Sequence, residues 1–172
     1  MKKAIVTGAT GFIGSWLAED LLENSYDVTL IVRNKANLLK DLQEQCHVIE
    51  KRIEDIDTPD IESCDICYHL AWGGVSSAHK NDLDIQLENI KLSLNLLEAV
   101  NKVGCQRFIS TGTVAEYALC DNVMDMAARQ TPNDLYGAAK VSAHYFLEVR
   151  ARQLNQPFIW CVLPSTFGEG SK

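Results

Sequence analysis

The sequence has no cluster of Lys and Arg, and its formal net charge is −7. A polyanion would meet repulsion instead of counterion release, which argues against nucleic acid as a partner. Signs of disorder or of collagen are also missing, since 47% of the 172 residues are hydrophobic and there are only ten Gly and four Pro. This length and composition predict one domain over residues 1–172.

An unbroken apolar run is missing as well. The start, Met1-Lys2-Lys3, resembles the basic head of a signal peptide, but the stretch behind it is interrupted by Gly8, Gly11 and Gly14. A secretory core is continuous, and no other stretch is long and apolar enough to span a bilayer. We therefore expect a cytoplasmic protein with no membrane partner.

The cysteines form no framework of disulfides or metal ligands. Cys64 and Cys67 form a Cys-x-x-Cys, which occurs in redox pairs and as half of a zinc site. No second Cys pair and no His at ligand spacing follow, and the segment resembles the start of a strand. Most of the cysteines lie in or beside apolar runs, where a thiol behaves as a small buried hydrophobe. We expect no metal site; the six cysteines are Cys46, Cys64, Cys67, Cys105, Cys120 and Cys161.

Short β-branched runs alternate with longer helical stretches along the chain. This alternation predicts an α/β fold, a doubly wound Rossmann-type parallel sheet with helices on both faces. The six predicted strands are Lys3–Thr7, Asp27–Val32, Cys46–Glu50, Asp65–Leu70, Arg107–Thr111 and Phe158–Leu163. Apolar residues at helical spacing predict helices at Phe12–Asn24, Leu83–Val103 and Leu135–Leu154, the last behind an Asn133-Asp134 pair that can cap it.

Three glycines lie where the first predicted strand turns into the first helix. Gly8 permits the tight turn, Gly11 lets the backbone approach a pyrophosphate, and Gly14 lets helix and strand pack closely. The helix N-terminus presents free N–H groups and a partial positive charge to phosphates. Such a turn can also serve only to reverse the chain, but its place at the start of a βαβ unit favours dinucleotide binding.

The end of the second predicted strand carries no acid. An acid there, about 20 residues after the last glycine, would bind the ribose 2′-hydroxyl and repel a 2′-phosphate. Arg33, Asn34 and Lys35 stand there instead. Arg33 can pair bidentately with a 2′-phosphate, assisted by Asn34 or Lys35, so NADP is favoured over NAD as cofactor. The alternatives for Arg33 are stacking on the adenine and exposure to solvent.

Tyr136 and Lys140 stand one helical turn apart and project from the same helix face. A phenol titrates near 10, too high for a base at neutral pH, and a neighbouring ammonium together with a positively charged nicotinamide lowers that pKa. Thr113, in a hydroxyl cluster after the fifth predicted strand, can donate a hydrogen bond to a substrate oxygen and steady Tyr136. Alternatively, these hydroxyls simply cap a strand end.

Taken in chain order, these motifs resemble the extended short-chain dehydrogenase/reductase family, the nucleotide-sugar epimerases and dehydratases. The resemblance covers nearly the whole chain. Its motifs are Thr7-Gly8-x-x-Gly11-Phe12-Ile13-Gly14, Asp55-Ile56, His69-Leu70-Ala71, Asn89, the hydroxyl cluster Ser110-Thr111-Gly112-Thr113, and Tyr136-x-x-x-Lys140.

The resemblance implies roles for particular residues. Tyr136 would be the acid/base, Lys140 would also hold the nicotinamide ribose, and Thr113 would be the third catalytic group, because the family's Ser or Thr precedes a Tyr, here Tyr117, by four residues. Ser110 and Thr111 remain alternatives to Thr113. The cofactor would be bound by Gly8, Gly11, Phe12, Ile13, Gly14, Arg33, Asp55 and Ile56 beside the adenine, Leu70 and Ala71 along the dinucleotide path, and Lys140.

Three of the resembling positions also have purely structural interpretations. Asp55 could be a turn residue, and His69 is best interpreted as a satisfied strand histidine. Asn89 could hold backbone or active-site geometry, or be an ordinary polar helix residue. These alternatives leave the glycine turn and the Tyr136 motif as the carriers of the functional prediction.

The chain departs from the family at its C-terminal end. Pro164–Gly168 is less similar to the family's Pro-x-x-x-Tyr-Gly, and Leu163 stands where an Arg commonly precedes that Pro. Family members usually continue into a seventh strand and a C-terminal lobe that binds the sugar nucleotide, whereas this sequence stops at Lys172. A truncated, proteolysed or naturally shortened protein is therefore expected.

The resemblance implies hydride transfer between nicotinamide C4 and a carbon of a hexose carried on a nucleoside diphosphate, with Tyr136 taking or giving the hydroxyl proton. Epimerisation, dehydration and reduction all remain open. The alternative is a sensor or scaffold that binds NADP without chemistry, which would not need Thr113, Tyr136 and Lys140. Related enzymes commonly dimerise through the helices predicted at 83–103 and 135–154, so a homodimer is expected.

Overall fold

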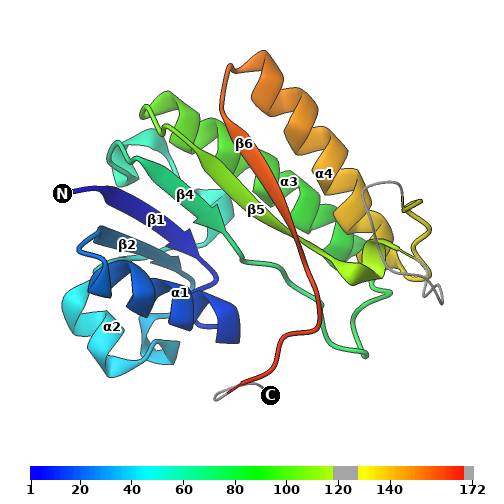
Figure 1. Cartoon of the computed structure of the whole chain (residues 1–172), viewed down its shortest axis with the longest axis horizontal. Coiled ribbons are helices and arrows are strands. Elements are labelled where there is room, and N and C mark those ends of the chain that lie inside the picture. Colours follow the sequence, from blue (N-terminus) through cyan, green and yellow to red (C-terminus); the bar gives the residue numbers. More distant parts are fainter. Residues whose placement is uncertain (118–127, 169–172) are drawn as a thin grey trace.

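The computed structural model describes residues 1–117 and 128–168 of the chain. A six-stranded parallel sheet in the order β3-β2-β1-β4-β5-β6 runs through the middle of the molecule (Figure 1). Its strands are β1 (Lys3–Thr7), β2 (Asp27–Val32), β3 (His47–Glu50), β4 (Ile66–His69), β5 (Phe108–Thr113) and β6 (Phe158–Leu163). The predicted doubly wound α/β fold is thereby confirmed.

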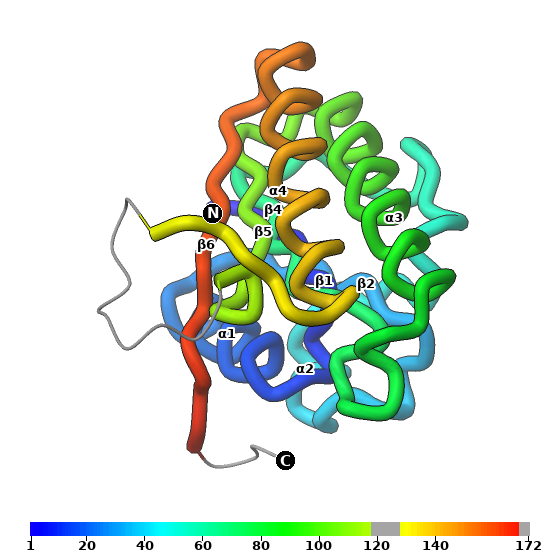
Figure 2. The backbone as a smooth tube through the Cα atoms, turned by 90° about the vertical axis from the view of Figure 1, so that its right-hand side faces the viewer, coloured from blue at the N-terminus to red at the C-terminus, as the bar shows by residue number. Residues whose placement is uncertain are grey.

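Helices cover both faces of the sheet, with α1 and α2 on one side and α3 and α4 on the other (Figures 1 and 2). The α-helices are α1 (Phe12–Glu23), α2 (Lys40–Gln45), α3 (Leu83–Lys102) and α4 (Leu135–Gln153). Short 3-10 helices are η1 (Lys35–Asn37), η2 (Ile53–Asp55), η3 (Thr58–Asp60) and η4 (Val114–Glu116).

The alternation of side chains along β1 divides the core into two parts. Val6 packs with Leu21 of α1 in one cluster, whereas Ile5 packs with Leu97 of α3 and Leu147 of α4 in the other. Each fully buried aliphatic side chain of this kind stabilises the fold by about 1.5–3 kcal/mol. The sheet is therefore fixed from both faces, as its near-continuous apolar strands require.

The strand order reverses between β1 and β4, and β1 pairs in parallel with β2 on one side and with β4 on the other. Thr7 lies beside Ile31 of β2 on one side and beside His69 of β4 on the other. The connections after β1 and β4 leave in opposite directions, toward α1 and α3. In open α/β sheets, ligands bind in the crevice outside the carboxyl ends of the strands at such a switch point.

Most predicted elements have the predicted bounds to within two residues, and β1, β2 and β6 match at both ends. The prediction for the fifth strand was wrong at its end, because pairing with β6 continues past Thr111 to Thr113, which lies beside Leu163. The prediction also missed α2, since this six-residue helix buries only Leu42 and shows no helical period. Asp134 caps α4 as predicted, accepting a 2.7 Å hydrogen bond from the Gly137 amide.

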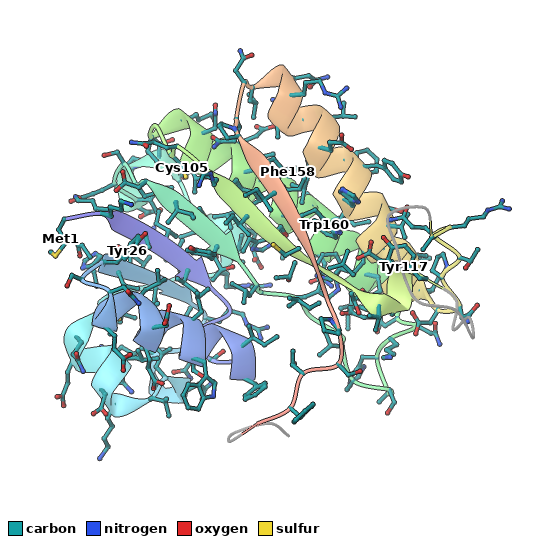
Figure 3. The ribbon with its side chains drawn as sticks, viewed as in Figure 1. Met1, Tyr26, Cys105, Tyr117, Phe158 and Trp160 are labelled. Atoms are coloured by element: carbon teal, nitrogen blue, oxygen red, sulfur yellow. The ribbon has the colours of Figure 1, made fainter. Side chains whose placement is uncertain are left out.

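Cys64, Cys67 and Cys105 are buried thiols, and burial raises the pKa of the Cys46 thiol to about 11. Figure 3 shows Cys105 at the amino ends of the strands, far from Tyr117 at their carboxyl ends.

Residues 1–117 and 128–168 contain no group of His, Cys, Asp or Glu arranged to hold a metal ion. Cys120 lies outside the described residues. Within the same ranges, none of the helices has the length and apolar character needed to cross a bilayer.

Candidate active site

The glycine turn joins β1 to α1 at the switch point of the sheet. Gly8 adopts φ +82° and its carbonyl accepts a 2.9 Å hydrogen bond from the Gly11 amide. Gly11 is the N-cap residue of α1, whose start has no side-chain cap and no acid in its first turn. The amides at this helix end therefore retain their capacity to bind an anion.

Each glycine of this turn meets a different steric limit. A Cβ at Gly8 would lie 2.7 Å from the Ala71 nitrogen, and one at Gly14 would lie 2.2 Å from the Gly8 oxygen. A Cβ at Gly11 would meet only the Gly8 oxygen, at 3.3 Å. The fold thus requires Gly8 and Gly14, whereas the absence of a side chain at Gly11 leaves the outer side of the turn open.

The interpretation of His69 as a satisfied strand histidine is confirmed. Its Nδ1 lies 2.8 Å from the Thr7 hydroxyl and its Nε2 lies 2.9 Å from the Ser93 hydroxyl. Burial lowers the pKa of His69 to about 3, so the ring is neutral near pH 7. The Thr7 hydroxyl also accepts a hydrogen bond from the Ala71 amide, which ties the end of β4 to the start of the glycine turn.

Asn89 holds the loop between β4 and α3. Its amide nitrogen donates to the Gly73 oxygen at 2.9 Å, and its oxygen accepts from the Gly73 nitrogen at 2.8 Å. This pair of bonds fixes the backbone directly after His69-Leu70-Ala71. Of its two interpretations, the one in which Asn89 holds backbone geometry is therefore confirmed.

Thr113, Tyr136 and Lys140 meet at the carboxyl end of β5. The Thr113 side chain lies close enough to the Tyr136 phenol to lower its pKa. The Lys140 ammonium group, one turn along α4, donates to the Thr111 oxygen at 2.7 Å. Helix α4 can approach so closely because residue 137 is glycine, where a Cβ would lie 2.3 Å from the Ala115 oxygen. A hydroxyl, a phenol and an ammonium group thus stand together at the carboxyl end of β5.

Comparison with known proteins identifies the family and supports the fold. The sequence profile of the NAD dependent epimerase/dehydratase family matches residues 4–172. The chain belongs to the NAD dependent epimerase/dehydratase family. It spans about half the length of the curated relatives that it matches.

Two relatives and one solved structure illustrate this membership. UDP-glucose 4-epimerase of Corynebacterium glutamicum is 27% identical over 149 residues, covering 83% of this chain and 45% of the relative. GDP-mannose 4,6-dehydratase of Yersinia enterocolitica is 29% identical, covering 89% of this chain and 46% of the relative. The crystal structure of UDP-glucuronic acid 4-epimerase from Bacillus cereus in complex with NAD has a TM-score of 0.87 and 26% identity, covering 99% of this chain and 58% of that one.

Other positions of the predicted cofactor site in this epimerase/dehydratase chain are distributed around the switch point. Phe12 and Ile13 are half-buried in the first turn of α1, and Leu70 and Ala71 are half-buried directly after β4. The side chain of Ile56 is 8% exposed and belongs to the core beside α3. The Ile56 side chain is therefore closed to a ligand, whereas Asp55 before it is exposed.

Arg33 is exposed at the carboxyl end of β2. The oxygen of the Asn34 side chain accepts a 2.9 Å hydrogen bond from the Ala36 amide and caps η1. The register of β3 places Glu50 beside Val32, and its carboxylate accepts from the Lys35 amide at 3.0 Å. One acid thus lies near Arg33 in space although none follows Val32 directly in the sequence.

The electrostatics of Tyr136 differ from the expectation that Lys140 lowers its pKa. In the protein alone, burial raises the pKa of Tyr136 above its usual 10, the Thr113 hydrogen bond opposes this rise, and the charges of Glu116 and Asp134 add to it. Burial lowers the pKa of Lys140 to about 7, and Glu116 opposes that shift. The phenol pKa therefore lacks the expected decrease because burial is its largest influence, and the Lys140 ammonium donates to the Thr111 oxygen instead.

Sequence reasoning missed two residues of this site, Trp72 and Glu116. The Lys140 ammonium lies 3.8 Å from the centre of the Trp72 ring, and Trp72 meets the Tyr136 ring edge-on at 6.4 Å. Its indole N–H donates to the Gln86 side chain at 2.9 Å. The place of Trp72 directly after His69-Leu70-Ala71 is a signal that could have found it, because this motif ends at the switch point.

Proposed function

We propose that the whole protein is an NAD(P)-dependent oxidoreductase of the nucleotide-sugar epimerase, dehydratase or reductase type, in which residues 1–172 form the NAD(P)-binding domain. The observation that carries the proposal is the meeting of Thr113, Tyr136 and Lys140 at the carboxyl edge of the sheet, the edge that also carries the glycine turn. A protein that only senses or displays NADP has no use for this arrangement. Family membership supports the same class of reaction.

The glycine turn fits a dinucleotide. Gly11 leaves its outer side free of a side chain, and the uncapped N-terminus of α1 offers amides to a pyrophosphate. Phe12, Ile13, Leu70 and Ala71 supply apolar surface on either side of that turn. Bound there, a nicotinamide would accept or return a hydride at a hexose carbon.

Each member of the trio has a distinct part in the proposed reaction. The Tyr136 oxygen takes the proton of the sugar hydroxyl as hydride leaves its carbon, and returns the proton when hydride comes back. The Thr113 hydroxyl donates to the same sugar oxygen and holds the phenol in place. Lys140, released from Thr111, hydrogen-bonds the nicotinamide ribose, and its positive charge then favours the phenolate.

A test of this function incubates the whole protein with NAD or NADP and a panel of UDP-glucose, UDP-glucuronic acid and GDP-mannose. These sugars are the ones bound or processed by the similar proteins, including the UDP-glucuronic acid 4-epimerase complex with NAD. We expect a C4 epimer, a 4-keto-6-deoxy product or a reduced sugar from at least one of them, identified by NMR. Binding of cofactor with no product from any sugar would instead support the sensor or scaffold.

We propose NADP as the preferred cofactor, on the strength of Arg33. Replacing Arg33 with Asp removes the guanidinium and adds a charge that repels a 2′-phosphate, so NADP affinity should fall by about 1.5–3 kcal/mol, or roughly 10- to 150-fold. NAD affinity should change little. Glu50 and the NAD-bound structures of similar proteins favour the opposite preference. Calorimetric titration of wild type and Arg33→Asp decides between them, and tighter NAD than NADP binding by the wild type refutes the Arg33 argument.

We also propose that two copies pair through α3 and α4, which lie side by side (Figure 2). Large apolar side chains on these helices are half or more exposed, and a patch of this kind is typical of an interface. They are Leu83, Leu87, Tyr145, Phe146 and Val149. Sedimentation equilibrium tests the dimer, because it measures whether the particle mass is that of one copy or two. The cytoplasmic location stays a prediction.

A further inference from the structure

A carboxylate is buried beside the proposed catalytic trio. Glu116, at the end of η4, is 0% exposed although it is one residue before the half-buried Tyr117. Burying a carboxylate is costly unless its oxygens are hydrogen-bonded. The bonds it makes therefore indicate what it does.

The strongest of these bonds goes to the residue that carries the catalytic hydroxyl. The Thr113 amide donates to Glu116 Oε1 at 2.7 Å, while the Thr113 hydroxyl accepts from the Ala115 amide at 3.3 Å. Together, Thr113 and Glu116 form a capping box around η4. This box determines the direction in which the Thr113 side chain leaves the end of β5.

Two further donors fix the other carboxylate oxygen. Gln130 donates to Glu116 Oε2 at 3.2 Å, and the Trp160 indole donates at 3.4 Å. Figure 3 shows Trp160 on β6, and its ring stacks on His144 of α4 at a centroid distance of 4.9 Å. Glu116 thus joins the end of β5 to the middle of β6 and to the segment before α4.

Gly112 makes room for this arrangement. A Cβ there would lie 2.4 Å from Glu116 Oε1 and 2.4 Å from the Trp160 indole nitrogen. The sequence Gly112-Thr113-x-x-Glu116 is therefore one unit, in which the glycine admits the carboxylate that caps the threonine.

We propose that Glu116 is a positioning residue that acts through Thr113: its buried carboxylate holds the turn after β5 so that the Thr113 hydroxyl faces the Tyr136 phenol. This proposal rests on the proposed function for its catalytic meaning. The geometry on which it stands is independent of cofactor and substrate.

The phenol pKa reports the Thr113 contact directly. The Thr113 hydrogen bond lowers the pKa of Tyr136, so Thr113→Ala should raise it. Other charged and titratable groups also face this region: Asp134 and Glu116 act on the phenol, Lys80 lies 5.6 Å from its ring centre, and Lys140 and His144 act on Glu116. The effect of Thr113→Ala on the phenol pKa is therefore compared between backgrounds that differ at residue 116. Contributions of the other groups that do not depend on Thr113 cancel in this comparison.

The experiment is a double-mutant cycle on the whole protein without cofactor. Tyrosine ¹³Cζ NMR follows the phenol, with Tyr136→Phe assigning its signal. Thr113→Ala is introduced into the wild type, Glu116→Ala and Glu116→Gln. We expect the rise in the Tyr136 pKa to fall to about half or less in the Glu116→Ala background. The full rise in the Tyr136 pKa should return in the Glu116→Gln background, because Gln keeps an oxygen acceptor for the Thr113 amide.

Glu98→Ala is the matched control, because Glu98 is a half-exposed carboxylate of α3 that pairs with Arg150 at 2.8 Å. Thr113→Ala should raise the phenol pKa in the Glu98→Ala background as much as in the wild type.

If Glu116→Ala does not fold, Glu116→Asp replaces it, since Asp keeps the charge but its side chain is one methylene shorter. An equal rise in all backgrounds overturns the proposal. Turnover is not needed for this readout, so an enzyme inactive on every sugar contradicts the proposed function alone.

Discussion

Tyr136→Phe is expected to slow turnover by about 10²- to 10⁴-fold, the usual contribution of a positioned general acid or base. The change removes one oxygen, so the hydroxyl proton of the sugar loses its acceptor. The ring stays, and with it the edge-on contact to Trp72 at 6.4 Å. NAD(P) affinity should therefore be nearly unchanged. The product assay with the active nucleotide sugar gives kcat, and calorimetry gives the cofactor Kd.

Tyr145→Phe provides the matched control for this loss. Tyr145 is on the same helix but is 56% exposed, and its position nine residues after Tyr136 is on the opposite face of α4. Its turnover should equal that of the wild type. Undiminished turnover by Tyr136→Phe would eliminate Tyr136 as the acid/base, and a large loss of cofactor affinity would show that the phenol serves binding instead.

Gly11→Val is expected to abolish most cofactor binding and to leave the fold intact. A Cβ at position 11 meets only the Gly8 oxygen at 3.3 Å, so the protein can accept the side chain with a small adjustment. A pyrophosphate approaching the start of α1 would meet the new methyl groups. Overpacking of this kind costs about 1–3 kcal/mol, which weakens Kd about 5- to 150-fold. Calorimetric titration measures the affinity, and thermal unfolding checks the fold.

Gly14→Ala should show the opposite pattern. Its Cβ would lie 2.2 Å from the Gly8 oxygen, which cannot move without displacing the turn, so the thermal midpoint should fall. The contrast separates the glycine that serves the ligand from the one that serves the fold. If Gly11→Val binds NAD(P) as tightly as the wild type, the pyrophosphate does not lie against this turn.

The fold could be predicted because its signals are local. The apolar strands and the helical spacing of α1, α3 and α4 are visible in the sequence, and buried pairs such as Ile5 and Leu97 follow from them. Helix α2 gave no such signal, because a single buried residue, Leu42, cannot define a period. The end of β5 depends on pairing with β6, which a local pattern does not contain.

The candidate site also contains features that local sequence patterns predict and features that they do not. Tyr136 and Lys140 are one helical turn apart, so their proximity follows from the sequence once the helix is recognised. Glu50 reaches the neighbourhood of Arg33 only through the register of β3. The raised pKa of Tyr136 could not be predicted either, because it arises from burial and from the charges of neighbouring elements. Glu116 did carry a signal, the Thr-x-x-Glu spacing of a capping box.

The central claim is that the turn formed by Gly8, Gly11 and Gly14 holds a nicotinamide dinucleotide. The most direct test is calorimetric titration of the wild-type protein with NAD, NADH, NADP and NADPH. We predict saturable binding of at least one oxidised and reduced pair with one site per chain. Absence of heat and of saturation for all four dinucleotides, in a protein shown to be folded, would contradict the account.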